Sequence, residues 1–164
     1  MKNLLIMRHA KSSWKELGLP DHERPLNKRG QHDAPKMGRL IRKKKLKPQL
    51  IICSSAKRAR ETLERVTEAF GYSQEIRFSE ALYGAGPEAY IKLLKELDEA
   101  YDRVMVVGHN PGLEALLERL TGEEQILPTA ALARVELPIK GWRKLGDSVD
   151  GELIDLWTPR QFSE

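Results

Sequence analysis

The sequence predicts an α/β fold, a three-layer sandwich with a mostly parallel central sheet. Apolar segments short enough to be strands alternate along the chain with longer segments of helical periodicity. This order is typical of a parallel sheet with helices on its faces. The length of 164 residues fits one domain, so we expect a single domain over residues 1–164. The content of 40% hydrophobic and 32% charged residues is typical of a globular protein.

The first predicted elements are a strand and, after a long polar loop, a helix. A short apolar run places a buried strand over residues 2–7. The next helical periodicity covers residues 33–46 approximately. Asp33 or Ala34 would precede the first turn of this helix, where Pro35 is tolerated because its missing N–H needs no partner there.

The second strand and helix follow directly. Residues 49–53 are apolar over their length and predict another buried strand. Ser54 and Ser55 are suited to cap a helix over residues 56–70. Gly71 predicts the end of that helix, because glycine readily takes the left-handed conformation that closes a helix.

The middle of the chain repeats the pattern. Residues 75–78 predict a short strand, and Gly86-Pro87 opens a helix that runs to about Asp98. The apolar segment from Asp102 to Val107 predicts a further buried strand.

The last third of the chain predicts one helix and two strands. Asn110-Pro111 is expected to cap and start a helix that ends near Thr121-Gly122. Residues 131–137 and 152–157 alternate apolar and polar side chains, which predicts an antiparallel pair at one edge of the sheet. Residues 141–151 would form their polar connection.

Composition narrows the class of protein. No apolar stretch is long enough to span a membrane, and the N-terminal apolar run is too short for a signal peptide. The single cysteine, Cys53, excludes an internal disulfide framework and suits a reducing compartment, so we expect a cytoplasmic protein with no membrane partner. The oligomeric state is left open, with a monomer as one alternative.

The chain carries a net charge of +4, and part of the excess lies in a basic run at residues 42–47. Basic side chains at a helix end complement the helix dipole, which favours a solvated helix end. An RNA-binding domain is an alternative, in which Lys43, Lys44 and Lys45 would contribute to salt-sensitive binding. The sequence has no RNA-binding signature, so we expect no nucleic-acid partner.

Three predicted strand ends carry residues suited to an anion. The first strand ends in Arg8-His9, the second is followed by residues 54–58 with Arg58, and the segment from Asp102 is followed by residues 108–112 with His109. Since the carboxyl ends of parallel strands share one sheet edge, these residues are expected to converge. Arginine matches phosphate oxygens, helix N-termini add N–H groups, and a neutral histidine can attack phosphorus.

These residues resemble the histidine phosphatase, or phosphoglycerate mutase-like, superfamily over most of the chain. The similarity comprises Arg8-His9, residues 54–62 and residues 108–112. The chain looks most like the small SixA-type phosphohistidine phosphatases, on the basis of Arg24-Pro25-Leu26, Gly30 and Asp33-Ala34. The resemblance implies a six-stranded, mostly parallel sheet with one antiparallel strand.

The resemblance also implies the catalytic roles. His9 would be the nucleophile that carries the phosphoryl group, Arg8 and Arg58 would hold the phosphoryl oxygens, and His109 would complete the pocket. No metal or other cofactor is expected, because the arginines supply the positive charge that phosphoryl transfer needs. Ala10 stands where much of the superfamily has glycine, and a small residue still fits.

Other site residues are candidates for proton transfer or substrate contact. Glu80 lies in a segment that resembles the one in which many members keep an acidic proton donor. Asp21 and His22, in the loop after the first strand, are rival donors or substrate contacts. Ser12 and Lys15 from the same loop are further candidates for substrate binding.

The expected substrate is phosphohistidine on another protein. Larger members of the superfamily insert a lid where this chain has only Gly84-Ala85-Gly86, so we expect an open pocket that admits a bulky phosphorylated partner. A small phosphomonoester is the alternative substrate. A phosphate-binding module without turnover is the alternative from a different class.

Three other patterns have simpler interpretations. Only four residues separate Cys53 from Arg58, whereas a cysteine-phosphatase loop needs five, so Cys53 is expected to be a buried strand residue. His22 and His32 have no partners at metal-ligand spacing and are expected at the surface. The three tryptophans are expected to pack in the core or at its rim: Trp14, Trp142 and Trp157.

Overall fold

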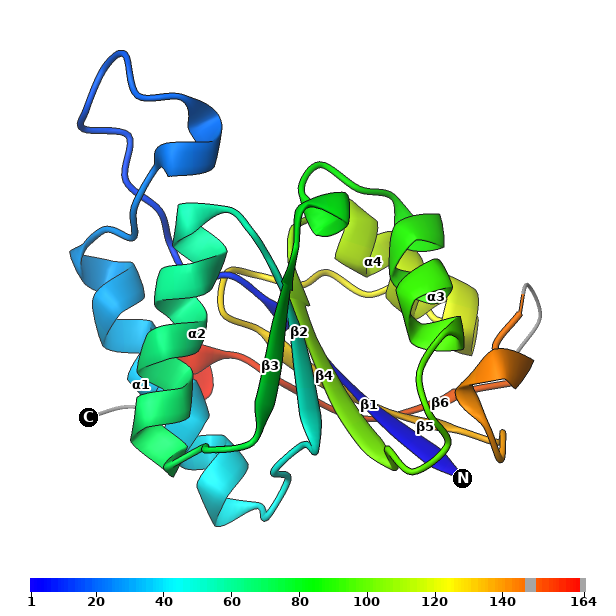
Figure 1. The fold of residues 1–164 in the computed structure, drawn as a ribbon. Coiled ribbons are helices and arrows are strands. Elements are labelled where there is room, and N and C mark those ends of the chain that lie inside the picture. The colour runs from blue at the N-terminus through cyan, green and yellow to red at the C-terminus, as the bar shows by residue number, and fades with distance from the viewer. Residues whose placement is uncertain (147–149, 163–164) are drawn as a thin grey trace.

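A six-stranded sheet forms the centre of the computed structural model, which describes residues 1–146 and 150–162 (Figure 1). Its strands lie in the order β3-β2-β4-β1-β5-β6. The strands are β1 (Lys2–Arg8), β2 (Leu50–Ser54), β3 (Glu75–Ser79), β4 (Arg103–Gly108), β5 (Leu132–Leu137) and β6 (Glu152–Trp157). Only β5 runs against the other five, which confirms the predicted mostly parallel sheet and its antiparallel edge pair.

Among the described residues, helices pack on both faces of the sheet (Figure 1). Helices α1 (Lys28–Lys43) and α2 (Lys57–Phe70) pack on one face, and α3 (Pro87–Lys95) and α4 (Gly112–Thr121) on the other. Alternate residues of β1 therefore enter different cores: Leu5 joins the α1/α2 side, and Leu4 joins the α3/α4 side. This arrangement confirms the three-layer sandwich.

Helix α1 starts earlier than the sequence analysis expected. Asn27 caps it, because the Asn27 side chain accepts a hydrogen bond from the Gly30 N–H at 2.8 Å. Pro35 lies inside the helix and not in its first turn, so the proline was a misleading start signal. The basic residues near the C-terminus of this helix are exposed, in agreement with a solvated helix end.

Two predicted helix caps are wrong for a shared reason. Ala56 and Pro111 hold the N-cap positions of α2 and α4, without side-chain caps. Ser54 instead lies 2.7 Å from the ring of His109, and Asn110 donates to the Leu127 carbonyl at 2.8 Å. Polar side chains at these strand ends bind neighbouring segments across the sheet edge, which local sequence does not reveal.

Several boundaries agree with expectation. Gly71 and Gly122 end α2 and α4 with φ of 70° and 76°, as predicted from the left-handed preference of glycine. Helix α3 ends at Lys95, short of Asp98. Residues 147–149 of the predicted β5–β6 connection lie outside the described residues.

None of the described helices is long and apolar enough to cross a membrane.

Glycine is required where the backbone approaches the site closely. A Cβ at Gly108 would overlap the hydroxyl oxygen of Tyr90, which accepts a hydrogen bond from the His109 N–H at 3.3 Å. A Cβ at Gly30 would overlap the Lys11 carbonyl. These two glycines let α3 and α1 approach the loops that follow β4 and β1.

Candidate active site

The ends of β1, β2 and β4 bring the predicted residues together. Arg8 pairs with Gly108 in the parallel register of β1 and β4, and the His9 N–H donates to the Gly108 carbonyl at 3.1 Å. The rings of His9 and His109 are 5.1 Å apart between centroids. The predicted convergence of distant strand ends is therefore present in the structure.

His9 is held in one protonation form. Its side chain is only 7% exposed, and Nδ1 lies 2.7 Å from the Ala10 carbonyl oxygen. Because a carbonyl can only accept, Nδ1 carries the hydrogen and Nε2 keeps a lone pair. Burial lowers the pKa of His9 to about 3, and the nearby positive groups act in the same direction. The result is a neutral imidazole with a free nucleophilic nitrogen.

Thr62 holds the backbone beside His9 and was not singled out by the sequence analysis. Its hydroxyl accepts the Ala10 N–H at 2.9 Å and donates to the Arg58 carbonyl at 2.7 Å. The side chain is fully buried. Thr62 therefore holds the N–H of Ala10, the residue whose carbonyl orients His9, and it ties the β1 loop to the start of α2.

Arg58 is anchored by Asp21, which lies in the 3-10 turn Asp21–Glu23 of the β1–α1 loop. Arg58 Nη1 donates to the Asp21 carbonyl at 2.7 Å, and Nη2 donates to its Oδ2 at 3.0 Å. Arg58 is 7% exposed, so this anchored guanidinium is a buried positive group. The predicted substrate contact Asp21 thus binds the predicted phosphate clamp.

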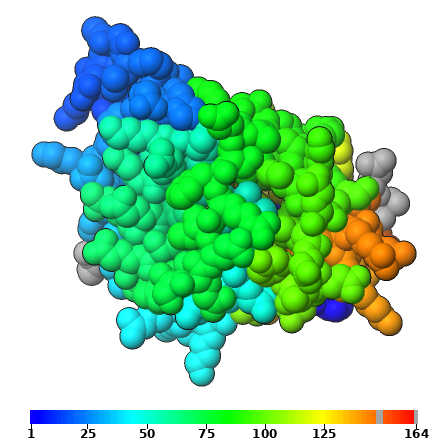
Figure 2. Space-filling model, viewed as in Figure 1, coloured from blue at the N-terminus to red at the C-terminus, as the bar shows by residue number. Residues whose placement is uncertain are grey.

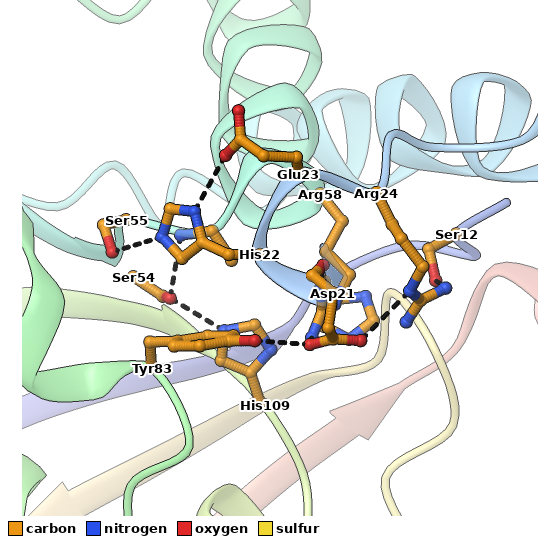
Figure 3. Close-up of polar contacts among 12 residues, drawn as sticks. Ser12, Asp21, His22, Glu23, Arg24, Ser54, Ser55, Arg58, Tyr83 and His109 are labelled. Atoms are coloured by element: carbon orange, nitrogen blue, oxygen red, sulfur yellow. Dashed lines mark hydrogen bonds and ion pairs between the residues drawn. The ribbon is translucent and has the colours of Figure 1, made fainter. Parts of the chain in front are cut away.

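Asp21 is the centre of a wider network (Figure 3). Its Oδ2 also accepts from the Tyr83 hydroxyl at 2.6 Å, and its Oδ1 accepts from Arg24 Nε at 3.1 Å. These hydrogen bonds, that of Tyr83 foremost, hold the pKa of Asp21 well below its usual range. Asp21 is therefore an ionised hydrogen-bond acceptor, a state that does not suit a proton donor.

His109 presents one nitrogen to Ser54 and leaves the other without a partner. Its Nε2 lies 2.7 Å from Ser54 Oγ, while its Nδ1 is buried and unpaired among the described residues. Burial, followed by the charge of Arg58, lowers the pKa of His109 to about 4. With Ser54 donating to Nε2, the neutral ring carries its hydrogen on Nδ1, free to donate to a ligand.

The loop before β5 closes another side of the site. Arg8 Nη1 donates to the Leu127 carbonyl at 3.0 Å, and the Ala130 N–H donates to the His9 carbonyl at 2.9 Å. The Leu127 N–H in turn donates to Glu114 at 2.8 Å. This segment therefore positions Arg8 and the backbone of His9 together.

Three buried nitrogens in the site have no hydrogen-bond partner among the described residues. They are Nε of Arg8, Nε of Arg58 and Nδ1 of His109, one from each strand end. Nε of Arg103 and Nε of Arg134 are also buried and unpaired within the described part of the chain, so the site is marked by the gathering of three such donors at neighbouring strand ends and not by a missing partner alone. Three such donors around a neutral His9 form a site suited to a tetrahedral oxyanion.

Three other predicted site residues, Ser12, Lys15 and Glu80, make no hydrogen bond to Arg8, His9, Arg58 or His109 in the part of the chain that the structure describes. Ser12 is buried and accepts from Arg24 Nη1 at 2.8 Å. Lys15 is exposed on the β1–α1 loop. Glu80 is exposed at the start of a 3-10 turn, Glu80–Leu82, directly after β3 and three residues before Tyr83.

Tyr83 lies in the site although no sequence pattern predicted it there, and His22 lies beside it. Tyr83 packs edge-on against His22 and His109, with centroids 4.8 Å and 5.7 Å away. His22 Nε2 lies 2.9 Å from Ser55 Oγ, and Nδ1 donates to Glu23 at 2.9 Å. The position of Tyr83 just before Gly84 was the available signal, since short loops at sheet edges carry site residues.

Cys53 is buried in β2, as expected. Burial raises the pKa of its thiol well above the usual range, so the thiol stays protonated. This environment does not activate a cysteine nucleophile.

The two buried histidines predict acid sensitivity of the fold. Both have an ordinary pKa of 6.5, lowered to about 3 and about 4 in the folded chain, so the unfolded chain takes up protons first. We expect the free energy of unfolding to have its full value above pH 6.5 and to decrease as the pH drops toward 4. Thermal unfolding measured across this pH range checks the prediction. A His9→Gln variant should show a flatter pH dependence of the free energy of unfolding. An unchanged slope would mean that His9 is not the source of the acid sensitivity.

Comparison with known proteins points to one family. Residues 4–85 match the model of the histidine phosphatase superfamily (branch 1). An uncharacterized chloroplastic protein of Arabidopsis thaliana is 32% identical over 152 residues, covering 87% of this chain and 70% of that protein. An uncharacterized protein of Mycobacterium leprae is 32% identical over 167 residues, covering 94% and 100% respectively.

Solved structures show the same fold. A provisionally named phosphohistidine phosphatase SixA from Agrobacterium tumefaciens has a TM-score of 0.84 and 31% identity, over 96% of this chain and 98% of that one. The protein histidine phosphatase SixA in complex with tungstate has the same TM-score at 23% identity, over 97% and 98%. At that lower identity the likeness concerns the fold alone.

Proposed function

Because this chain belongs to the histidine phosphatase superfamily and is a phosphatase, we propose that it removes phosphate from phosphohistidine on a protein, through a phosphoryl group carried by His9. Arg8, Arg58 and His109 bind the phosphoryl oxygens. The observation that supports this most strongly is the set of three unpaired buried nitrogens around a neutral imidazole. Oriented donors of this kind stabilise the charge that spreads over phosphoryl oxygens in the transition state.

The reaction proceeds in two displacements. In the first, the lone pair of His9 Nε2 forms a bond to phosphorus while the bond from phosphorus to the substrate imidazole breaks, and the leaving nitrogen takes a proton. In the second, a water oxygen attacks phosphorus and the bond to Nε2 breaks, which returns the lone pair to His9. The water proton leaves to a base, and the products are phosphate and unmodified histidine.

Glu80 is the proposed proton donor in the first step and the base in the second. It is exposed at the start of the 3-10 turn that leads from β3 to Tyr83, and we assign its carboxyl to the leaving group of an incoming substrate. Asp21 serves instead as the anchor of Arg58, because its low pKa keeps it ionised. Ser12 and Lys15 are the proposed substrate contacts from the β1–α1 loop. The hydroxyl of Ser12 is held by the hydrogen bond that it accepts from Arg24.

The short segment before α3 supports a protein substrate over a small one. Only Gly84-Ala85-Gly86 lies between Tyr83 and Pro87, so no lid extends from this point over the site. An open site admits a phosphohistidine that projects from a protein surface. The name of the phosphohistidine phosphatase SixA from Agrobacterium tumefaciens, which is 31% identical to this chain, supports the same substrate class.

Comparison of two substrates tests the proposal. We expect kcat/KM for a protein phosphorylated on histidine to exceed that for para-nitrophenyl phosphate by at least an order of magnitude. The exposed Lys47, in the basic run outside the site, provides a control: Lys47→Ala should match the wild type. Equal or better turnover of the small ester would support the phosphomonoesterase alternative, and phosphate binding without turnover would support a binding module.

A further inference from the structure

The loop between β1 and α1 carries a projecting arm, which we define as residues 14–24. Figure 1 shows this segment standing beyond the ends of helices α1 and α2, and in Figure 2 it forms a lobe that projects from the main body. The arm borders the site, because its residues Asp21 and His22 contact Arg58 and Ser55. A partner that approaches His9 from this side therefore meets the arm.

The arm is fixed at its base. Ser12 and Leu26 form an antiparallel bridge, and the Ser13 N–H donates to the Pro25 carbonyl at 2.8 Å. Arg24 adds a cross-link, because its Nη1 donates to Ser12 Oγ at 2.8 Å and to the Ser13 carbonyl at 3.1 Å. An element held in this way loses little conformational entropy when it binds a partner.

Two large apolar side chains are exposed on the arm. Trp14 is 71% exposed, so the expectation that it packs in the core or at its rim is wrong, and Leu17 is 95% exposed. The Trp14 ring lies 3.5 Å from the Arg24 guanidinium, which stacks over its face. Single exposed apolar residues are ordinary on protein surfaces. Here, however, the tryptophan is stacked on a buried arginine and presents an ordered aromatic surface. Tryptophan and arginine are enriched among the residues that contribute most to protein–protein binding.

Contacts link Trp14 to Arg58, the residue proposed to bind phosphoryl oxygens. Arg24 donates to Asp21 Oδ1 at 3.1 Å, and the other oxygen of the same carboxylate accepts from Arg58 at 3.0 Å. Trp14, Arg24, Asp21 and Arg58 therefore form one chain of contacts from the surface to the site. A partner held by Trp14 therefore lies on the same side of the molecule as Arg58, two residues away along this chain of contacts.

We propose that the arm, through Trp14 and Leu17, is the docking element for the protein that carries the phosphohistidine. This inference rests on the proposed function and extends it to a recognition surface. The phosphoryl group meets the basic pocket, while apolar surface around the phosphohistidine covers Trp14 and Leu17. A small phosphate ester fills only the pocket, so it gains nothing from either side chain.

A comparison of large and small substrates tests the docking role. In the Trp14→Ala/Leu17→Ala variant we expect KM for the phosphohistidine protein to rise on the order of tenfold or more. We expect kcat for that protein, and kcat/KM for para-nitrophenyl phosphate, to stay near wild type. Phe78→Ala is the matched control, because Phe78 is 52% exposed on β3 and lies 5.2 Å beneath the Arg60 guanidinium, outside the arm.

Each other outcome overturns the inference. An unchanged KM for the protein substrate excludes docking by these side chains. Equal losses with both substrates mean that Trp14 acts through Arg24 and Asp21 on the clamp. A wild-type dimer that the double variant converts to a monomer assigns the surface to a second copy of the chain.

A binding measurement separates this inference from the proposed function. The phosphohistidine protein is titrated against His9→Ala, with and without the two arm substitutions, so that no turnover is needed. Weaker binding after the arm substitutions supports docking even if turnover assays fail. Unchanged binding overturns docking even if the phosphatase activity is as proposed.

Discussion

The His9→Ala variant is expected to lose turnover of phosphohistidine protein to the level of the uncatalysed reaction. The arginines and His109 remain to bind the substrate, but no nitrogen is left to accept the phosphoryl group. We therefore expect substrate binding to persist while kcat disappears. Steady-state kinetics and equilibrium titration on the same preparation measure both quantities.

The fold of this variant is expected to survive. His9 is buried as a neutral ring, and burial disfavours its charged form. Replacing it with alanine therefore removes no buried charge or ion pair from the fold. Circular dichroism and thermal unfolding at neutral pH serve as the control. Retained turnover in a folded His9→Ala protein would show that another group attacks phosphorus.

The Arg58→Ala variant is expected to lose several orders of magnitude in kcat/KM. Its guanidinium is buried, anchored through two nitrogens to Asp21, and left with an unpaired Nε among the described residues. Guanidinium donors to phosphoryl oxygens contribute effects of this size in phosphoryl transfer. The measurement is kcat/KM with para-nitrophenyl phosphate, which does not depend on docking of a protein.

Two further variants sharpen the Arg58 result. Arg58→Lys should recover little activity, because a lysine cannot bind Asp21 through two nitrogens and also direct a third toward phosphate. Arg60→Ala, on the exposed side of the same helix, should behave as the wild type. Near-normal activity of Arg58→Ala would mean that the residues around β2 do not form the phosphate site.

The fold and the convergence of the site could be predicted because they depend on simple regularities. Buried parallel strands appear as short apolar runs, and their carboxyl ends share an edge however far apart they lie in sequence. His9 and His109 thus meet across 100 residues because β1 pairs with β4 in parallel. The positions of Arg8 and Arg58 follow from the same rule.

The features that the sequence did not predict correctly depend on contacts between loops. Asp21 and Tyr83 are 62 residues apart, in two irregular segments, and no periodicity relates them. Ser54 and Asn110 have the composition of helix caps, yet both bind across the sheet edge. Which partner a polar side chain chooses depends on what the fold brings near it, and local sequence carries no record of that choice.

Trapping the phosphorylated protein tests the central claim most directly. Wild type and His9→Ala are mixed with phosphohistidine substrate, quenched rapidly in alkali, and digested for mass spectrometry. We expect a phosphoryl group on His9 of the wild type, stable in alkali and lost in acid, and none on the variant. A phosphoryl group on any other residue of the wild type, or one that persists in His9→Ala, would contradict this expectation.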